Sequence, residues 1–74
     1  MKANIAALLE LAKARNWNTP ELARRLGIDY SYWFRIIRGE KKGGPKLWIG
    51  IYRLCKQEGL SVDEYIFMEE NQNI

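Results

Sequence analysis

Apolar residues recur along this chain at intervals of three and four, the spacing that places side chains on one face of an α-helix. The first stripe predicts an amphipathic helix over roughly residues 3–15, and it consists of Ile5, Leu8, Leu9 and Ala12. A capping hydroxyl followed by a proline, at Thr19-Pro20, then begins a short second helix over about 20–26. Gly27 ends this second helix.

Three more helices are predicted after this turn. Asp29 is expected to cap the third, over about 30–38, whose apolar stripe is Trp33, Ile36 and Ile37. Pro45 begins the fourth, which continues to Gly59 along the apolar positions Leu47, Trp48, Ile51, Leu54 and Cys55. A capping box then predicts a short fifth helix with Tyr65, Ile66 and Met68, and its residues are Ser61-Val62-Asp63-Glu64.

Residue usage and length support a single helical domain. The β-branched residues Val and Thr occur once each, whereas Leu and Ile occur eight times each and Ala six, a poor supply for an all-β domain. A length of 74 residues accommodates one small domain without a separate sensor or catalytic domain. We therefore expect an all-α fold, a compact five-helix domain over residues 1–69, with a frayed tail over 70–74.

The chain contains no histidine and one cysteine, Cys55. These counts exclude a disulfide framework, a zinc site with Cys/His spacing and a catalytic triad that needs an imidazole base. We therefore expect no enzymatic activity, cofactor, metal or small-molecule substrate, and a location in the reducing cytoplasm. Because no stretch approaches the roughly 20 apolar residues of a bilayer-spanning helix, no membrane partner is expected either.

Charge is distributed unevenly around a formal net charge of +3. Residues 21–46 hold seven basic and three acidic side chains, whereas residues 58–74 hold five acidic side chains and no basic one. A basic centre beside an acidic end is typical of a chain that meets a polyanion with one face.

A glycine-centred turn separates the second and third predicted helices, which is the arrangement that a helix-turn-helix requires. Ala23, Gly27 and Trp33 stand at intervals of four and six. A small residue lets the two helices cross closely, the glycine takes a positive φ in the turn, and the apolar residue anchors the third helix. This spacing favours a DNA-binding unit.

Two stretches of the chain match the pattern of a known family. The first runs from Thr19 to Gly39, TPELARRLGIDYSYWFRIIRG, and the second from Pro45 through Tyr65, ending in Gly-Leu-Ser-Val-Asp-Glu-Tyr. With these residues the chain resembles the phage repressor and Cro-like helix-turn-helix proteins, often called the XRE family. The resemblance implies a five-helix DNA-binding domain whose third helix lies in the major groove, with its N-terminal part against base edges.

The resemblance also assigns roles to individual positions. It places base contacts at Tyr30, Ser31, Phe34 and Arg35, with Tyr32 beside them. It places phosphate contacts at Thr19, in the second helix, and at Arg38, Lys41 and Lys42, after the recognition helix. The chemistry of these side chains fits, since arginine binds guanine O6 and N7 bidentately, aromatic rings pack on a thymine methyl, and lysine neutralises phosphate.

The expected function is that of a sequence-specific double-stranded DNA-binding transcriptional regulator, a small Cro-like repressor. One short helix reads only a few base pairs, so we expect a homodimer on a pseudo-palindromic operator. Candidate dimer contacts are Tyr65, Ile66, Phe67, Met68 and Ile74, and packing within the monomer is an equal alternative for the first three. A monomeric accessory factor, similar to an excisionase or a plasmid-maintenance protein, stays open.

Several features depart from the family pattern, among them Ile37, where a polar residue is common, and Glu58, where the fourth helix usually ends in Leu. Trp33 replaces the usual Ile or Val anchor, and Gly43-Gly44 adds one residue to the loop before the fourth helix. An aromatic face on the third helix is formed by Tyr30, Tyr32 and Phe34. Because such a surface is also typical of protein-binding patches, the alternative function is a protein-interaction module on a helix-turn-helix scaffold.

Overall fold

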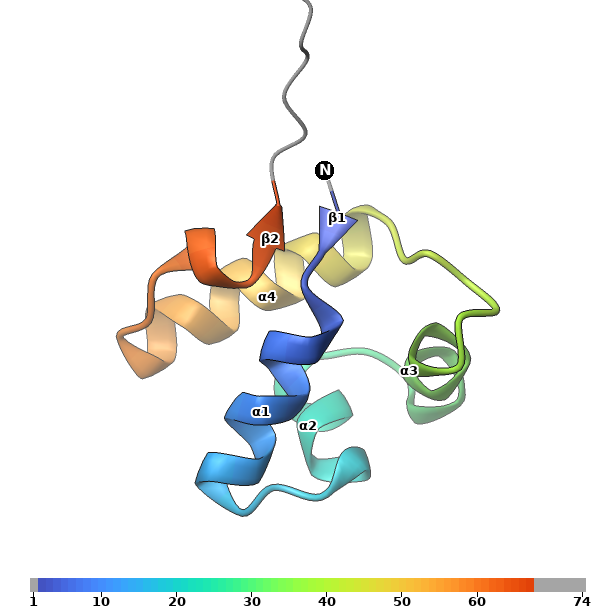
Figure 1. The fold of residues 1–74 in the computed structure, drawn as a ribbon, viewed down its shortest axis with the longest axis horizontal. Helices are drawn as coiled ribbons and strands as arrows, with labels where there is room; N and C mark the ends of the chain where they lie inside the picture. The colour runs from blue at the N-terminus through green and yellow to red at the C-terminus, as the bar shows by residue number, and fades with distance from the viewer. Residues whose placement is uncertain (1, 68–74) are drawn as a thin grey trace, which may run out of the picture.

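Four α-helices and a two-stranded sheet make up residues 2–67, the part of the chain that the structure, a computed structural model, describes (Figure 1). The helices are α1 (Ile5–Arg15), α2 (Thr19–Leu26), α3 (Tyr30–Ile37) and α4 (Pro45–Glu58), followed by a short 3-10 helix, η1 (Val62–Glu64). The strands are β1 (Lys2–Ala3) and β2 (Ile66–Phe67). No helix within these residues is long and apolar enough to cross a bilayer.

Asparagine side chains set the starts of the first two helices. The Asn4 side chain accepts a hydrogen bond from the Ala7 N–H at 3.1 Å, and the Asn18 side chain accepts one from the Glu21 N–H at 2.9 Å. Thr19 was the predicted cap of α2, and this prediction is wrong because Thr19 is already the first helical residue. Asparagine satisfies the exposed N–H groups at a helix start as well as Ser or Thr does.

The second half of the predicted helix-turn-helix forms as expected. Asp29 caps α3, and its carboxylate accepts hydrogen bonds from the N–H groups of Ser31, at 3.0 Å, and Tyr32, at 3.4 Å. Gly27 takes a φ of +74° at the end of α2, a conformation that costs glycine little. The predicted spans of 20–26 and 30–38 therefore agree with α2 and α3 within one residue.

The predicted fifth α-helix is absent from the described residues, and its place is taken by η1 and β2. The Ser61 side chain makes no capping hydrogen bond. Instead, the Asn4 N–H donates to the Tyr65 carbonyl at 2.8 Å, and β2 pairs antiparallel with β1. The backbone groups after Glu64 thus find partners at the other end of the chain. The all-α prediction needs a corresponding correction, to a mostly helical fold with a small sheet.

Some predictions fall on residues outside the described part of the chain. These are the frayed tail over 70–74, the C-terminal part of the 1–69 domain, and the dimer contacts Met68 and Ile74.

Side chains from all four α-helices form one core, with Trp33 at 0% exposure. The residues that are buried along with it include Leu8, Leu22, Leu26, Leu47, Ile51 and Leu54. In α1 the predicted inward position Leu9 is exposed, and Leu11 is buried in its place. Leu9 stands four residues after Ile5 and Leu11 three after Leu8, so both have helical spacing and only packing against the other helices selects between them.

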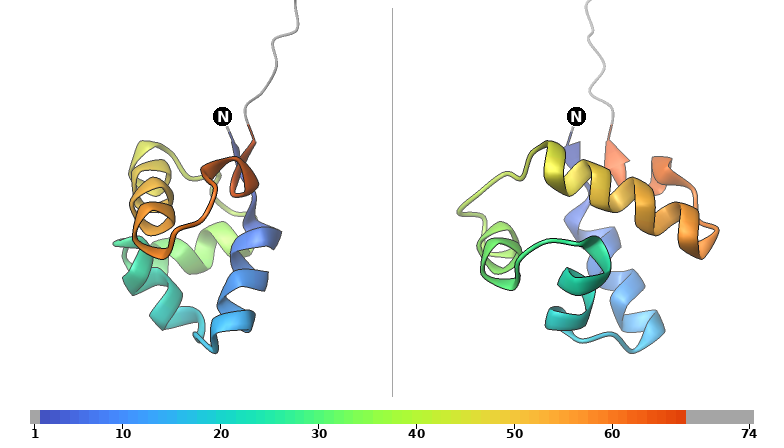
Figure 2. Two further views of the ribbon diagram at one scale, coloured as in Figure 1. Left: turned by 90° about the vertical axis from the view of Figure 1, so that its left-hand side faces the viewer. Right: turned by 180° about the vertical axis from the view of Figure 1, so that it is seen from behind.

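A glycine within α4 permits the closest approach between two helices. Gly50 is buried, and a Cβ atom built there would collide with the backbone carbonyl oxygen of Leu26. This contact lets α4 lie across the C-terminal end of α2, as the two views in Figure 2 show. Through this contact α4 packs on α2, and α2 in turn packs on α3.

Candidate nucleic-acid interface

The helix α3 presents two different faces. Trp33 and Ile36 point into the core, and the opposite side is exposed. Helical spacing places Tyr30, Phe34 and Arg38 in one row along this exposed side, and Ser31 and Arg35 in the neighbouring row. The structure therefore brings together five of the nine residues that the sequence assigned to DNA contact.

In the row of Tyr30, Phe34 and Arg38, each side chain contacts the next. The ring centroids of Tyr30 and Phe34 lie 5.9 Å apart. The two residues are 45% and 40% exposed, respectively. The Arg38 guanidinium carbon lies 5.4 Å from the Phe34 ring centroid, and Arg38 Nη2 lies 2.8 Å from a carboxylate oxygen of Glu40. Arg38 is thus held between an aromatic ring and a carboxylate.

The loop from Gly39 to Gly44 supplies two further cations beside α3. Lys41 and Lys42 are exposed there, and they line a shallow hollow of about 400 Å³ together with Tyr32. Tyr32 is half-buried against the core, whereas Tyr30 and Phe34 are exposed. The structure therefore separates Tyr32 from the exposed rows and places it at the loop.

Thr19 is the one candidate that belongs to neither α3 nor the loop. It is half-buried in the first turn of α2, directly after the segment that joins α1 to α2.

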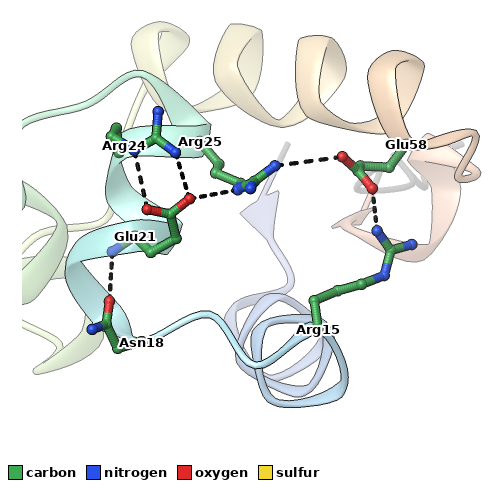
Figure 3. Close-up of polar contacts among 6 residues, drawn as sticks. All are labelled: Arg15, Asn18, Glu21, Arg24, Arg25 and Glu58. Atoms are coloured by element: carbon green, nitrogen blue, oxygen red, sulfur yellow. Dashed lines mark hydrogen bonds and ion pairs between the residues drawn. The ribbon is translucent and has the colours of Figure 1, made fainter.

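Several other arginines are occupied in a network that joins three helices (Figure 3). Glu21 pairs with Arg24 and Arg25 in α2, and Glu58 at the end of α4 pairs with Arg25 and with Arg15 of α1. The hydrogen bonds from Arg24 and Arg25 hold the pKa of the Glu21 carboxyl below its usual value. Arg15 and Arg25 thus link α1 and α2 to the end of α4, while Arg24 pairs within α2 alone.

The cations near α3 are different in this respect. Within residues 2–67, Arg35, Lys41 and Lys42 form no ion pair, so their charge is not neutralised by a neighbouring carboxylate. Part of the positive charge that a polyanion would meet therefore lies at α3 and the loop after it, and the sequence alone does not reveal which cations are paired.

An apolar groove of about 380 Å³ lies between α4 and the C-terminal segment. Ile49 and Tyr52, its most exposed α4 residues at 59% and 53%, line it with Pro45, Trp48, Val62, Asp63 and Ile66. The amine of Lys56 lies 5.6 Å from the Tyr52 ring centroid, so both charge signs border the groove. The sequence analysis missed this surface, although Ile49 and Tyr52 stand three apart and off the inward stripe of α4.

The described candidate dimer residues differ in burial, and of them Ile66 lines the groove. Tyr65 and Ile66 are buried within the monomer, while Phe67 is exposed. Burial is the principal cause that raises the pKa of the Tyr65 hydroxyl. Burial also raises the pKa of the Cys55 thiol, so this thiol is protected from reaction. Within the part of the chain that the structure describes, no group of His, Cys, Asp and Glu is placed to hold a metal ion.

The chain matches no protein-family model, no curated protein and no solved structure. The surface chemistry of α3 and the neighbouring loop is the feature of the molecule that bears on its function.

Proposed function

We propose that this protein is a sequence-specific double-stranded DNA-binding transcriptional regulator, a small repressor that reads the major groove with α3. The observation that carries the proposal is the outer face of α3, where hydrogen-bonding, aromatic and unpaired cationic side chains lie together beside a basic loop. A major groove about 12 Å wide admits a helix of this kind. Duplex DNA offers base edges and phosphates that match these groups.

Each side chain has a role in this proposal. Arg35 binds guanine O6 and N7, while Ser31 and Tyr30 donate hydrogen bonds to base edges or phosphates. Phosphate contacts come from residues around the recognition helix, namely Thr19, Tyr32, Arg38, Lys41 and Lys42. Arg38 exchanges Glu40 for a phosphate on binding, since that ion pair is solvent-exposed and contributes little to stability.

A dimer is part of the proposal because α3, with eight residues, reaches only a few base pairs. We assign the groove between α4 and the C-terminal segment to a second copy of the chain. Its apolar lining includes the exposed residues Ile49 and Tyr52, and its rim carries Lys56 and Asp63, charges of opposite sign that a symmetric partner complements. A uniformly anionic partner would not complement both Lys56 and Asp63 at this rim.

The test is selection of bound molecules from a random-sequence duplex pool at two salt concentrations. We expect one enriched motif, composed of two mirrored half-sites about 34 Å apart, and a dimer mass by sedimentation equilibrium. Failure to enrich any motif, with weak binding that disappears at moderate salt, contradicts the proposal. A single unrepeated site bound by a monomer contradicts the dimer alone.

Replacement of Arg35 by alanine is expected to lower discrimination at one guanine position by roughly tenfold to a hundredfold, because a bidentate contact contributes about 1–3 kcal/mol. Affinity for unrelated duplex DNA should change little. Competition binding against a library of single-base variants measures both quantities. Arg53→Ala, at an exposed arginine of α4, is the control and should retain the wild-type preference at every position. An Arg35→Ala profile that matches the wild type rejects the assignment.

The double variant Lys41→Ala/Lys42→Ala should bind all duplexes more weakly and with a smaller dependence on salt. Each phosphate contact that is lost lowers the slope of log K against log[salt] by about 0.9. Titrations at several salt concentrations give this slope. Lys13→Ala, in the last turn of α1, removes a cation far from α3 and should leave the slope unchanged. Equal slopes for the wild type and the double variant would show that the loop does not contact DNA.

The second candidate function is a protein-interaction module that uses the outer face of α3. The observation that favours it is the exposed pair of Tyr30 and Phe34, since contiguous apolar surface is typical of protein-binding sites. The unpaired cations around the pair favour DNA instead. Selection of a duplex motif decides between the two candidates.

A further inference from the structure

The aromatic rings of Tyr30 and Phe34 are exposed to solvent on α3, and neither residue belongs to the core. The helix is anchored from its other side by Trp33 and Ile36, which are buried. The contact between Tyr30 and Phe34 spans one helical turn and adds only slightly to helix stability. The rings therefore lack a structural reason to be exposed together, and their chemistry is available to a ligand.

The neighbours of Phe34 limit how its ring can bind. Tyr30 lies one turn before it and the Arg38 guanidinium one turn after it, with centroid distances of 5.9 Å and 5.4 Å. Stacking of an unpaired base needs a free ring face, as in single-stranded nucleic acid binding. Because both axial neighbours crowd the Phe34 ring, its outward edge is the part left for contact. That edge suits a small apolar group.

The charged side chains near the rings limit the chemical class of the ligand further. Arg35 lies in the row next to the ring pair, and Lys41 and Lys42 lie in the loop after α3. These three cations have no ion-pair partner in residues 2–67. A partner that fits this surface is polyanionic, and it also carries small apolar groups within reach of the side chains on the outer face of α3. In duplex DNA the apolar group on the major-groove edge of a base pair is the C5-methyl of thymine. A C5-methylated cytosine presents the same group at the same ring position.

We propose that the Tyr30–Phe34 pair recognises the C5-methyl group of a pyrimidine in the major groove, next to the guanine that Arg35 binds. This inference rests on the proposed function and names the part of the operator that the aromatic rings read. The pair distinguishes C5-methylated pyrimidines from cytosine and uracil. Its apolar contact adds to the hydrogen bonds of Arg35, which do not detect a methyl group.

The experiment uses the duplex enriched by selection and compares forms that differ only in methyl groups. In one series, deoxyuridine replaces each thymidine in turn, and in another, 5-methyldeoxycytidine replaces thymidine with guanine in the opposite strand. At the one or two positions read by the rings, loss of a methyl should weaken binding about fourfold, the value of one buried carbon. Retained affinity for 5-methylcytosine, above that for cytosine, shows that the methyl group itself is recognised.

Three protein variants separate this contact from a general effect. Phe34→Ala should bind thymidine and deoxyuridine duplexes equally, while Phe34→Leu, which keeps an apolar group, should retain part of the difference. Leu9→Ala removes an exposed apolar residue from α1 and should retain the whole difference. Circular dichroism melting establishes that each variant is folded.

The outcomes distinguish this inference from the proposed function. Equal affinity of the wild type for thymidine and deoxyuridine forms at every position overturns the inference and leaves DNA binding intact. A methyl effect that persists unchanged in Phe34→Ala also overturns it. Failure to enrich any duplex overturns both the inference and the proposed function.

Discussion

Replacement of Trp33 by alanine is expected to lower the free energy of unfolding by about 3–5 kcal/mol, the usual cost of removing a large buried aromatic side chain. Trp33 is completely buried, and it joins α3 to the core that the other helices form. Small domains have a stability near the lower end of about 5–15 kcal/mol. The variant should therefore be largely unfolded at physiological temperature, and the proposed DNA binding should be lost with the fold. Urea denaturation followed by circular dichroism measures the change.

Trp33→Phe gives a sharper comparison at the same site. The indole Nε1 of Trp33 is buried without a hydrogen-bond partner among the described residues. Removing that unsatisfied donor recovers about 1–3 kcal/mol, which offsets much of the packing lost with the smaller ring. We expect the phenylalanine variant to lie within about 1 kcal/mol of the wild type. A Trp33→Ala variant that loses less than 1 kcal/mol would show that Trp33 does not anchor α3.

Replacement of Gly50 by alanine is expected to destabilise the protein by about 1–3 kcal/mol or more, as overpacking of a core usually does. The added methyl group would collide with the Leu26 carbonyl oxygen, a backbone atom that moves only with α2 itself. Helix propensity predicts the opposite sign, because alanine in a helix interior is favoured over glycine by about 1 kcal/mol. The sign of the change therefore tests the contact between α2 and α4.

Gly44→Ala is the matched control for this experiment. Gly44 precedes α4, has no positive φ, and has open space where a Cβ atom would stand. We expect a change of less than about 1 kcal/mol there, the ordinary cost of alanine at a helix N-cap. Thermal or urea unfolding of both variants is sufficient. A Gly50→Ala protein more stable than the wild type would contradict the close approach of α4 to α2.

The helix-turn-helix was predictable because its signals are local. The Asp29 cap acts on N–H groups two and three residues away, and the positive φ at Gly27 follows from the chemistry of one residue. The apolar spacing also identified Trp33 and Ile36 as inward residues. The exposed candidates Tyr30, Ser31, Phe34 and Arg35 then follow, since they occupy the other side of the same short helix.

The segment after Ser61 was not predictable from local signals. A capping box is a weak preference, and the hydrogen bonds from Asn4 to the backbone of Glu64 and Tyr65 outweigh it. These partners stand some 60 residues apart in the sequence. Because β1 and β2 have two residues each, neither carries a period-two pattern long enough to recognise.

By itself, the sequence determined the four α-helices, the turn between α2 and α3, and the side chains on the exposed face of α3, because each depends on hydrogen bonds and spacing within a few residues. Only the tertiary structure decided between Leu9 and Leu11, gave Gly50 its role, and divided the arginines between the Glu21–Glu58 network and the exposed surface. It also revealed the groove beside α4. Those outcomes depend on which distant segments meet, and the free energy of such contacts is set by packing between helices rather than by local preference.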